Sequence, residues 1–219
     1  MWPIQALWLN ALRIGAMTNP RWTPTLDRAA KSFQQRFWNE ARGCLYDVVD
    51  ADHINGAADA ALRPNQIFAI GGLPFASIEG ERAERVLTAV EEHLLTPLGL
   101  RSLAPGEKDY QGRYAGGVRE RDGAYHQGTV WPWLIGAFVE AWLHAKGNTK
   151  VTRQEARRRF LAPLQHHLGS AGLGHVAEIA DAEAPHTPRG CPFQAWSLGE
   201  LLRVERMLAE PTVQVTRTT

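Results

Sequence analysis

The 219-residue sequence lacks long apolar runs, is poor in cysteine and has no long run of one charge. No stretch reaches the roughly 18 apolar residues that a membrane span requires, and the N-terminus lacks the basic segment and cleavage site of a signal peptide. The two cysteines are far apart and have neither metal-ligand spacing nor the pattern of a secreted disulfide framework. The low cysteine content fits a reducing compartment, so we expect a cytoplasmic protein. Because the sequence has no long apolar run, we expect no membrane partner.

Positive and negative charges are nearly balanced, because the formal net charge is +1 and 21% of the residues are charged. The densest basic cluster, at 157–159, is short and lies on a predicted helix. Nucleic-acid binding therefore has little electrostatic support, since it depends on many cationic contacts to phosphates. With 44% hydrophobic residues the chain can form a core, and we expect a single domain over 1–219 that ends in a disordered tail at 209–219.

Apolar residues recur at helical spacing through most of the chain, whereas strand signals are short. The first periodic segment starts at the N-terminus, where MWPIQALWLNALRIGA has an apolar face suited to burial. Residues 44–49, CLYDVV, could form a small hairpin and no more. We therefore predict an all-α fold. The further predicted helices are 25–42, 66–76, 79–95, 127–146, 152–169 and 193–208.

Three long segments separate these helices, at 43–65, 96–126 and 170–192. Loops of this length are usually either disordered or functional. These contain all four tyrosines, whereas disordered linkers are poor in aromatic residues. Helices that alternate with long loops gathered at one end are typical of an α/α toroid, in which the loops build a ligand cleft. A plain helical bundle with loops of no function is the alternative.

Polar side chains gather where the first long loop enters a predicted helix. In LRPNQIFAI (62–70), Arg63, Asn65 and Gln66 surround Pro64. The proline disfavours helix at Arg63 and presets the turn. We expect these polar side chains to crowd the start of the helix, where they can bind a ligand.

The second long loop ends in the same way, with Tyr125, His126 and Gln127 before an apolar segment that contains Trp131 and Trp133. Aromatic faces beside amide and guanidinium donors suit a pyranose ring, which offers C–H faces for stacking and hydroxyls for hydrogen bonds. The pattern suggests a carbohydrate ligand. Core packing is the competing interpretation for at least two of Trp131, Trp133 and Trp142, and a helix cap is the competing role for His126.

The chain contains five ordered motifs: PIQALWLNALRIGA, LYDVVD, LRPNQIFAI, YHQGTVWPWLIGAFVEAW and PHTPRGCPFQAWSLGELL. They resemble the C-terminal part of the catalytic domain of glycogen debranching enzymes of the amylo-α-1,6-glucosidase type. The similarity runs from about residue 3 to 208. It implies about half of the twelve helices of an (α/α)6 toroid, hydrolysis of α-1,6-linked glucose with inversion, and no metal or organic cofactor. The expected partner is an α-glucan such as glycogen, limit dextrin or a maltooligosaccharide.

The resemblance gives a role to Glu178, which lies in the third long loop in GHVAEIADAEAPHTPRGCPFQAWS. A loop glutamate often serves only solubility. The family's general base, however, lies in the segment before the RGC turn, and this position is Glu178 here. Asp181 and Glu183 are close enough in sequence to be the alternatives. Gln194 and Trp196 match the same family motif, and we expect them to bind substrate.

Inverting glycosidases use a second carboxyl group as general acid. In the family this aspartate precedes the QALW helix, and the present sequence begins almost at that helix. Asp47, Asp59 and Asp109 are the candidates within the chain. Half a toroid would expose apolar helix faces, which favours a homo-oligomer or a chain that supplies the other half. Three alternatives stay open: a glycosidase completed by another polypeptide, an inactive carbohydrate-binding remnant, and a truncated gene product without function.

Overall fold

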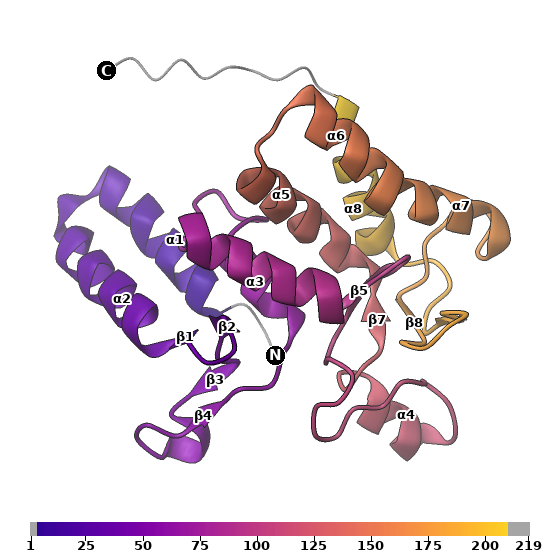
Figure 1. Cartoon of the computed structure of the whole chain (residues 1–219), viewed down its shortest axis with the longest axis horizontal. Coiled ribbons are helices and arrows are strands. Elements are labelled where there is room, and N and C mark those ends of the chain that lie inside the picture. Colours follow the sequence, from indigo (N-terminus) through magenta and orange to yellow (C-terminus); the bar gives the residue numbers. More distant parts are fainter. Residues whose placement is uncertain (1–3, 210–219) are drawn as a thin grey trace.

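The computed structural model describes residues 4–209, and eight α-helices lie in this part of the chain (Figure 1). None of these helices combines the length and apolar character needed to cross a membrane. The predicted tail at 209–219 lies outside the described residues except for Ala209, which ends α8. The helices are α1 Ile4–Thr18, α2 Thr23–Arg36, α3 Gly80–His93, α4 Val118–Ala124, α5 Ile135–Lys146, α6 Lys150–Ala156, α7 Ala162–Ser170 and α8 Ala195–Ala209.

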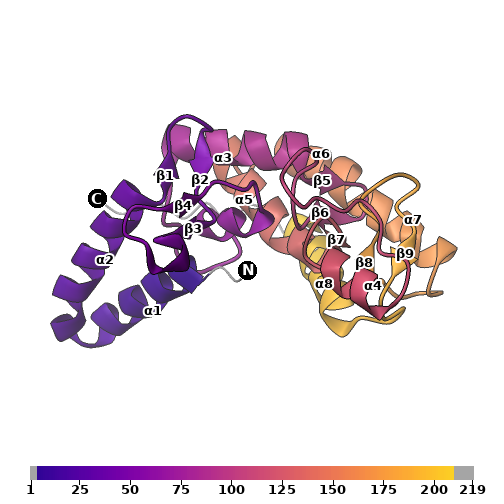
Figure 2. The same cartoon turned by 90° about the horizontal axis from the view of Figure 1, so that it is seen from below.

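Seven of the eight helices in residues 4–209 form three groups along an elongated molecule, and α4 stands apart from these groups (Figure 2). α1 and α2 pack as a hairpin at one end, α3 and α5 pack together in the middle, and α6, α7 and α8 lie at the other end. α3 buries one face, because its apolar residues Ala83, Val86, Leu87 and Val90 recur at spacings of three and four. α5 is buried on most of its surface, which fits its central place.

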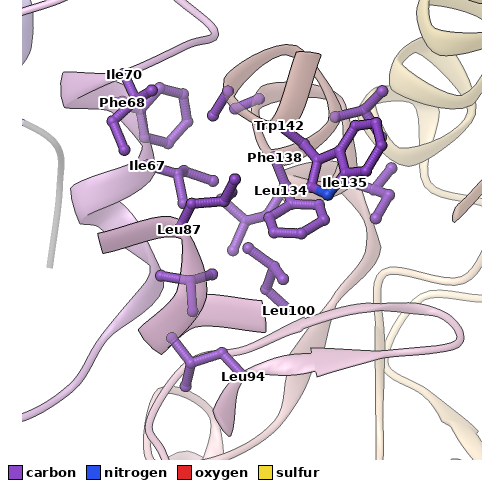
Figure 3. Packing of buried hydrophobic residues seen from close by; sticks show 14 of the residues in the cluster. Ile67, Phe68, Ile70, Leu87, Leu94, Leu100, Leu134, Ile135, Phe138 and Trp142 are labelled. Carbon is purple, nitrogen blue, oxygen red and sulfur yellow. The ribbon is translucent and has the colours of Figure 1, made fainter. Parts of the chain in front are cut away.

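Buried side chains of α3, α5, the neighbouring strands and the short 3-10 helix η3 (Pro64–Ala69) form the main core (Figure 3). Ile67 in η3 and Phe138 in α5 are both 0% exposed. The segment that begins with Arg63 is therefore anchored directly to the core. Members of this core labelled in Figure 3 are Ile67, Phe68, Ile70, Leu87, Leu94, Leu100, Leu134, Ile135, Phe138 and Trp142.

The prediction of an all-α partial (α/α)6 toroid is wrong, because the fold is α plus β. A five-stranded antiparallel sheet has the order β5-β6-β7-β8-β9, and two separate hairpins lie nearer the N-terminus. Strands of two or three residues are too short to show an alternating pattern, so periodicity misses them. In the sheet the strands are β5 Leu95–Thr96, β6 Gly99–Arg101, β7 Val130–Trp131, β8 Ile179–Ala180 and β9 Pro188–Arg189; in the hairpins they are β1 Trp38–Asn39 with β2 Cys44–Leu45 and β3 Val48–Val49 with β4 Ala58–Asp59.

Prolines explain two further departures from the predicted helices. The predicted helix at 127–146 starts instead as β7, continues in the 3-10 helix η4 (Pro132–Leu134) and becomes α5 at Ile135. Trp131 is extended because Pro132 follows it. Arg63 is likewise extended before Pro64, as predicted, although the helix that follows is the 3-10 helix η3 rather than an α-helix over 66–76.

Other helix boundaries differ by less. The predicted helix at 152–169 is divided into α6 and α7 by a π-helical turn, η5 (Arg157–Leu161), and the predicted loop at 96–126 contains α4. The predicted hairpin at 44–49 is also wrong, because its two strands pair with segments outside it. The remaining 3-10 helices are η1 Pro20–Trp22 and η2 Ala51–His53.

Candidate functional site

A groove of about 640 Å³ lies between η3, the segment around β7 and helix α8. Its volume is within the range of about 300–1,000 Å³ that is common for small-molecule sites. We call it the aromatic groove, because four of its lining residues are Tyr125, Trp131, Trp133 and Trp196. The predicted site residues that line it are Arg63, Asn65, Tyr125, His126, Trp131 and Trp196.

The rings of the groove contact one another in a continuous series. The His126 ring stacks on Trp131 with centroids 5.1 Å apart and an angle of 8° between the planes. Tyr125 meets Trp131 edge to face at 4.9 Å. Trp196 lies 6.4 Å from Trp131 and 6.1 Å from Trp133. The groove therefore offers several aromatic surfaces at different angles to one ligand.

The tryptophans differ in how much of their surface a ligand can reach. Trp142 is 2% exposed and belongs to the core, and Trp131 is 6% exposed although its ring reaches the groove. Trp196, in contrast, is 48% exposed. Trp131 thus mainly supports the other rings, whereas Trp196 has the most surface to offer a ligand.

The carboxylate of Glu178 accepts a hydrogen bond on each oxygen. The hydroxyl of Tyr125 donates to Oε1 at 2.6 Å, and the backbone N–H of Cys191 donates to Oε2 at 3.0 Å. Burial, together with the bond to Glu178, raises the pKa of Tyr125 further above its ordinary value, so its hydroxyl remains a hydrogen-bond donor even in alkaline solution. The backbone N–H of Glu178 also donates to the carbonyl of Cys191 at 2.9 Å. This carboxylate is therefore held in one position.

Gly190 makes room for that carboxylate. Its φ is +66°, a left-handed conformation that favours glycine, and a Cβ at this position would meet Oε2 of Glu178. The glycine of the RGC turn thus allows the turn to close onto the carboxylate.

The antiparallel sheet brings Glu178 into contact with Tyr125, a groove residue, although Glu178 does not itself line the aromatic groove. Tyr125 precedes β7 and Glu178 precedes β8, and these strands pair through Val130 and Ala180. The pairing joins the second and third long loops, which are distant in sequence. This strand pairing brings Tyr125 and Glu178 within hydrogen-bond distance.

Asp181 and Glu183, the alternatives to Glu178, form hydrogen bonds and ion pairs with residues outside the groove. Asp181 is buried, accepts a hydrogen bond from the backbone N–H of Tyr114 at 2.8 Å and pairs with Arg189 at 2.9 Å. Glu183 is exposed and accepts a hydrogen bond from the hydroxyl of Tyr110 at 2.6 Å. Like Glu178, neither carboxylate lines the groove, but their hydrogen-bond donors described here do not line it either, whereas Tyr125, the donor to Glu178, does.

Arg63 joins the loops behind the groove. Its guanidinium donates to the carbonyl oxygens of Ser102 at 3.0 Å and His126 at 2.7 Å, and to Oε1 of Gln127 at 2.8 Å. Its Nε lies 3.2 Å from Oδ2 of Asp47. Most of its donors are thus used within the protein, so its main role is to fix the loop that carries His126 and Gln127.

The three predicted glutamines do not line the groove. Gln66 is buried, accepts from the backbone N–H of Leu45 at 3.1 Å and donates to the carbonyl of Arg63 at 2.9 Å. Gln127 accepts from Arg63, and Gln194 donates its backbone N–H to Val176 just before α8. These glutamines therefore connect the segments around the groove and do not form part of its surface.

The three aspartates that the sequence offers as general acid do not line the groove either, although Asp47 contacts Arg63, which does. Asp47 lines a separate cavity of about 60 Å³, and burial raises its pKa to about 6 although the charge of Arg63 opposes the rise. Asp59 is exposed and accepts from the backbone N–H of Ala61 at 2.9 Å, and Asp109 is exposed. Within residues 4–209 no group of three His, Cys, Asp or Glu side chains could hold a metal ion.

Two polar lining residues, Ser102 and Glu200, were not predicted from the sequence. Ser102 Oγ accepts from the backbone N–H of Gly128 at 3.0 Å. Glu200 follows Trp196 by four residues on α8, and this spacing could have revealed it, because such residues share one face of a helix.

The sequence pattern of the amylo-α-1,6-glucosidase family matches residues 3–203, and the chain belongs to this family. The prediction of family from the motifs is therefore confirmed. The chain is 30% identical over 162 residues to the glycogen debranching enzyme of Saccharomyces cerevisiae. This alignment covers 66% of the present chain and 10% of the yeast protein, so the chain spans about a tenth of that relative.

Proposed function

We propose that this chain takes part in hydrolysis of α-1,6-glucosidic branch linkages in glycogen or related α-glucans, by inversion, with Glu178 as general base. The observation that carries the proposal is the carboxylate of Glu178, which is fixed by donors to both oxygens and joined to the aromatic groove through Tyr125. In an inverting glycosidase one ionised carboxylate activates water while a protonated carboxyl group donates to the leaving oxygen. Glu178 suits the first role.

The groove supports an α-glucan as the ligand. Its exposed indole of Trp196 and the ring of His126 offer surfaces for the C–H faces of glucose, and the side chain of Asn65 can pair with hydroxyl groups. The name of the family and the name of the yeast relative point to the same class of substrate.

The general acid has no candidate in the described part of the groove. Glu200 is the one carboxylate among residues 4–209 that lines it, and Arg203 pairs with Glu200 at 3.0 Å. Both oxygens of Glu200 accept hydrogen bonds from Arg203, so in this arrangement the group is used as an acceptor and not as a proton donor. We infer that the acid comes from outside residues 4–209, either in the same polypeptide or in a partner chain.

A substrate that needs no general acid tests the role of Glu178 directly. Fluoride leaves without protonation, so the chain should convert α-glucosyl fluoride to β-glucose while it releases little glucose from limit dextrin. Glu178→Gln should lower fluoride hydrolysis by about 10²–10⁴-fold, because general base catalysis contributes about that much. Glu183→Gln is the matched control and should retain the rate.

Two outcomes would contradict the proposal in different ways. Unchanged fluoride hydrolysis by Glu178→Gln would remove Glu178 as the base. Rapid glucose release from limit dextrin by the chain alone would place the acid within this chain, where Asp47 would be the first candidate to substitute.

A carbohydrate-binding protein without catalysis is the second candidate function, because the aromatic groove does not depend on an acid. It would bind maltotriose at millimolar concentration in calorimetry and hydrolyse neither substrate. A truncated product without function would show neither binding nor hydrolysis. The cytoplasmic location and the absence of a nucleic-acid partner stay predictions.

A further inference from the structure

One side of the aromatic groove is formed by α8, where Trp196 and Glu200 both line it. Their spacing of four residues places the indole and the carboxylate on the same face of the helix. Gly199, between them, also lines the groove, and a Cβ there would have no neighbour within 4 Å. The groove is thus open to a ligand beside both side chains.

The carboxylate of Glu200 is fixed before any ligand arrives. Arg203 donates to Oε1 through Nε at 3.0 Å and to Oε2 through Nη2 at 3.0 Å, and its Nη1 donates to Glu140 on α5 at 2.7 Å. Gly136 on α5 lets the carboxylate approach closely, because a Cβ at this position would collide with Oε2 of Glu200. A carboxylate that is already fixed loses little conformational entropy when it binds a ligand.

Glu200 still has acceptor capacity, since a carboxylate can accept about four hydrogen bonds and Arg203 uses only part of them. Its side chain is 25% exposed. An exposed indole and a hydrogen-bond acceptor side by side match a pyranose ring, which has a C–H face and hydroxyl donors at its rim.

This place is separate from Glu178. Tyr125, which binds Glu178, contacts Trp131, and Trp131 in turn contacts Trp196. Trp196 and Glu200 line the groove, whereas Glu178 does not, and the contacts described here run from Glu178 to the α8 side through Tyr125 and Trp131. A glucose unit on Trp196 would be a different unit from the one that reacts at Glu178.

We propose that Trp196 and Glu200 form a binding position for a non-reacting glucose unit of the α-glucan chain. The inference rests on the proposed function of the groove. It predicts that affinity rises with chain length, because only a longer oligosaccharide reaches this position as well as the one near Glu178.

Calorimetric titration of the whole chain with maltose and maltopentaose tests the proposal. Wild type should bind maltopentaose more tightly than maltose. Glu200→Gln should weaken maltopentaose binding about 10-fold, as expected for loss of a hydrogen bond to a charged group. Trp196→Ala should weaken it at least as much, and because the ring is 48% exposed the variant should stay folded in thermal unfolding.

Glu140→Gln is the matched control, because it breaks an ion pair of the same Arg203 without touching the groove. It should bind maltopentaose like wild type. Equal weakening by Glu140→Gln and Glu200→Gln would show that Glu200 is only structural and would overturn the inference. Unchanged binding by Glu200→Gln would overturn it too, while the proposed function would stand. Failure of wild type to bind either sugar would overturn both.

Discussion

The hydroxyl of Tyr125 donates a hydrogen bond of 2.6 Å to the carboxylate of Glu178, across 53 residues of sequence. One end of the tyrosine belongs to the aromatic groove and the other holds the candidate base. The contact depends on the pairing of β7 with β8, so the small sheet links the aromatic groove to Glu178. The first two predictions test this arrangement.

Tyr125→Phe should lower the hydrolysis of α-glucosyl fluoride by about 10-fold, since loss of a hydrogen bond to a charged group costs roughly 1.5–3 kcal/mol. The phenylalanine ring keeps the contact with Trp131, so the variant should stay folded and lose no more stability than this one hydrogen bond supplies. Tyr110→Phe is the control, because it removes a bond of the same length, 2.6 Å, to Glu183. Equal rates for the two variants would contradict the role of Tyr125.

Gly190→Ala should abolish most of this hydrolysis, because the new methyl group would displace Oε2 of Glu178. It also strains a left-handed backbone at a cost of about 1–2 kcal/mol. Gly174→Ala separates the two effects, because Gly174 has a φ of +92° but no neighbour within 4 Å of the added Cβ. Both variants should lose stability in urea unfolding, and only Gly190→Ala should lose activity. Parallel losses of activity would show that strain alone is responsible.

Local sequence signals predicted local features well. The apolar spacing of α3 and α8 follows from residues within one helix, and Pro64 fixes the extended conformation of Arg63. The same reasoning missed the sheet, because its central pairing rests on Val130 and Ala180, which lie in separate loops. A contact between distant short strands leaves no periodic trace in either segment.

In the candidate site, too, the sequence predicted single residues but not the contacts between distant segments. The sequence identified Glu178 and Trp196 through a family motif, but not the bond between Glu178 and Tyr125. It also identified Gln66 as a polar residue at the start of a helix, where the structure buries it against Leu45. A motif shows which side chains are polar at a turn, while the direction in which each one points depends on the packing around it.

Self-association is the third prediction, and it concerns α1. Several large apolar side chains on this helix are exposed, and a contiguous apolar patch favours association. We expect light scattering at micromolar concentration to find a dimer or a larger species. Trp8→Lys should shift the protein toward monomer, whereas Val151→Lys, an exposed apolar position on α6, should not. A stable wild-type monomer would contradict the prediction. The exposed apolar residues of α1 are Ile4, Leu7, Trp8, Ile14 and Met17.

The last prediction concerns the stability contributed by Asp47 as a function of pH. Burial raises the pKa of Asp47 from 3.8 to about 6, and the residues that the structure describes give its Oδ2 no hydrogen bond. The folded protein thus holds this proton more tightly than the unfolded chain. The contribution is fully present below a pH of 3.8 and is lost as the pH rises through about 6. The rise in pKa corresponds to at most about 3 kcal/mol.

Asp47→Asn removes the titrating group and keeps its shape, so urea unfolding of wild type and variant from about pH 4 to about pH 7 isolates the effect. The stability of wild type relative to the variant should fall by up to about 3 kcal/mol over this interval. Asp59→Asn, at an exposed carboxylate on the paired strand β4, should show no such fall. A difference in stability between wild type and Asp47→Asn that stays constant with pH would contradict the prediction. It would mean that Arg63 keeps Asp47 ionised throughout, and that this pairing, rather than burial, determines the pKa of Asp47.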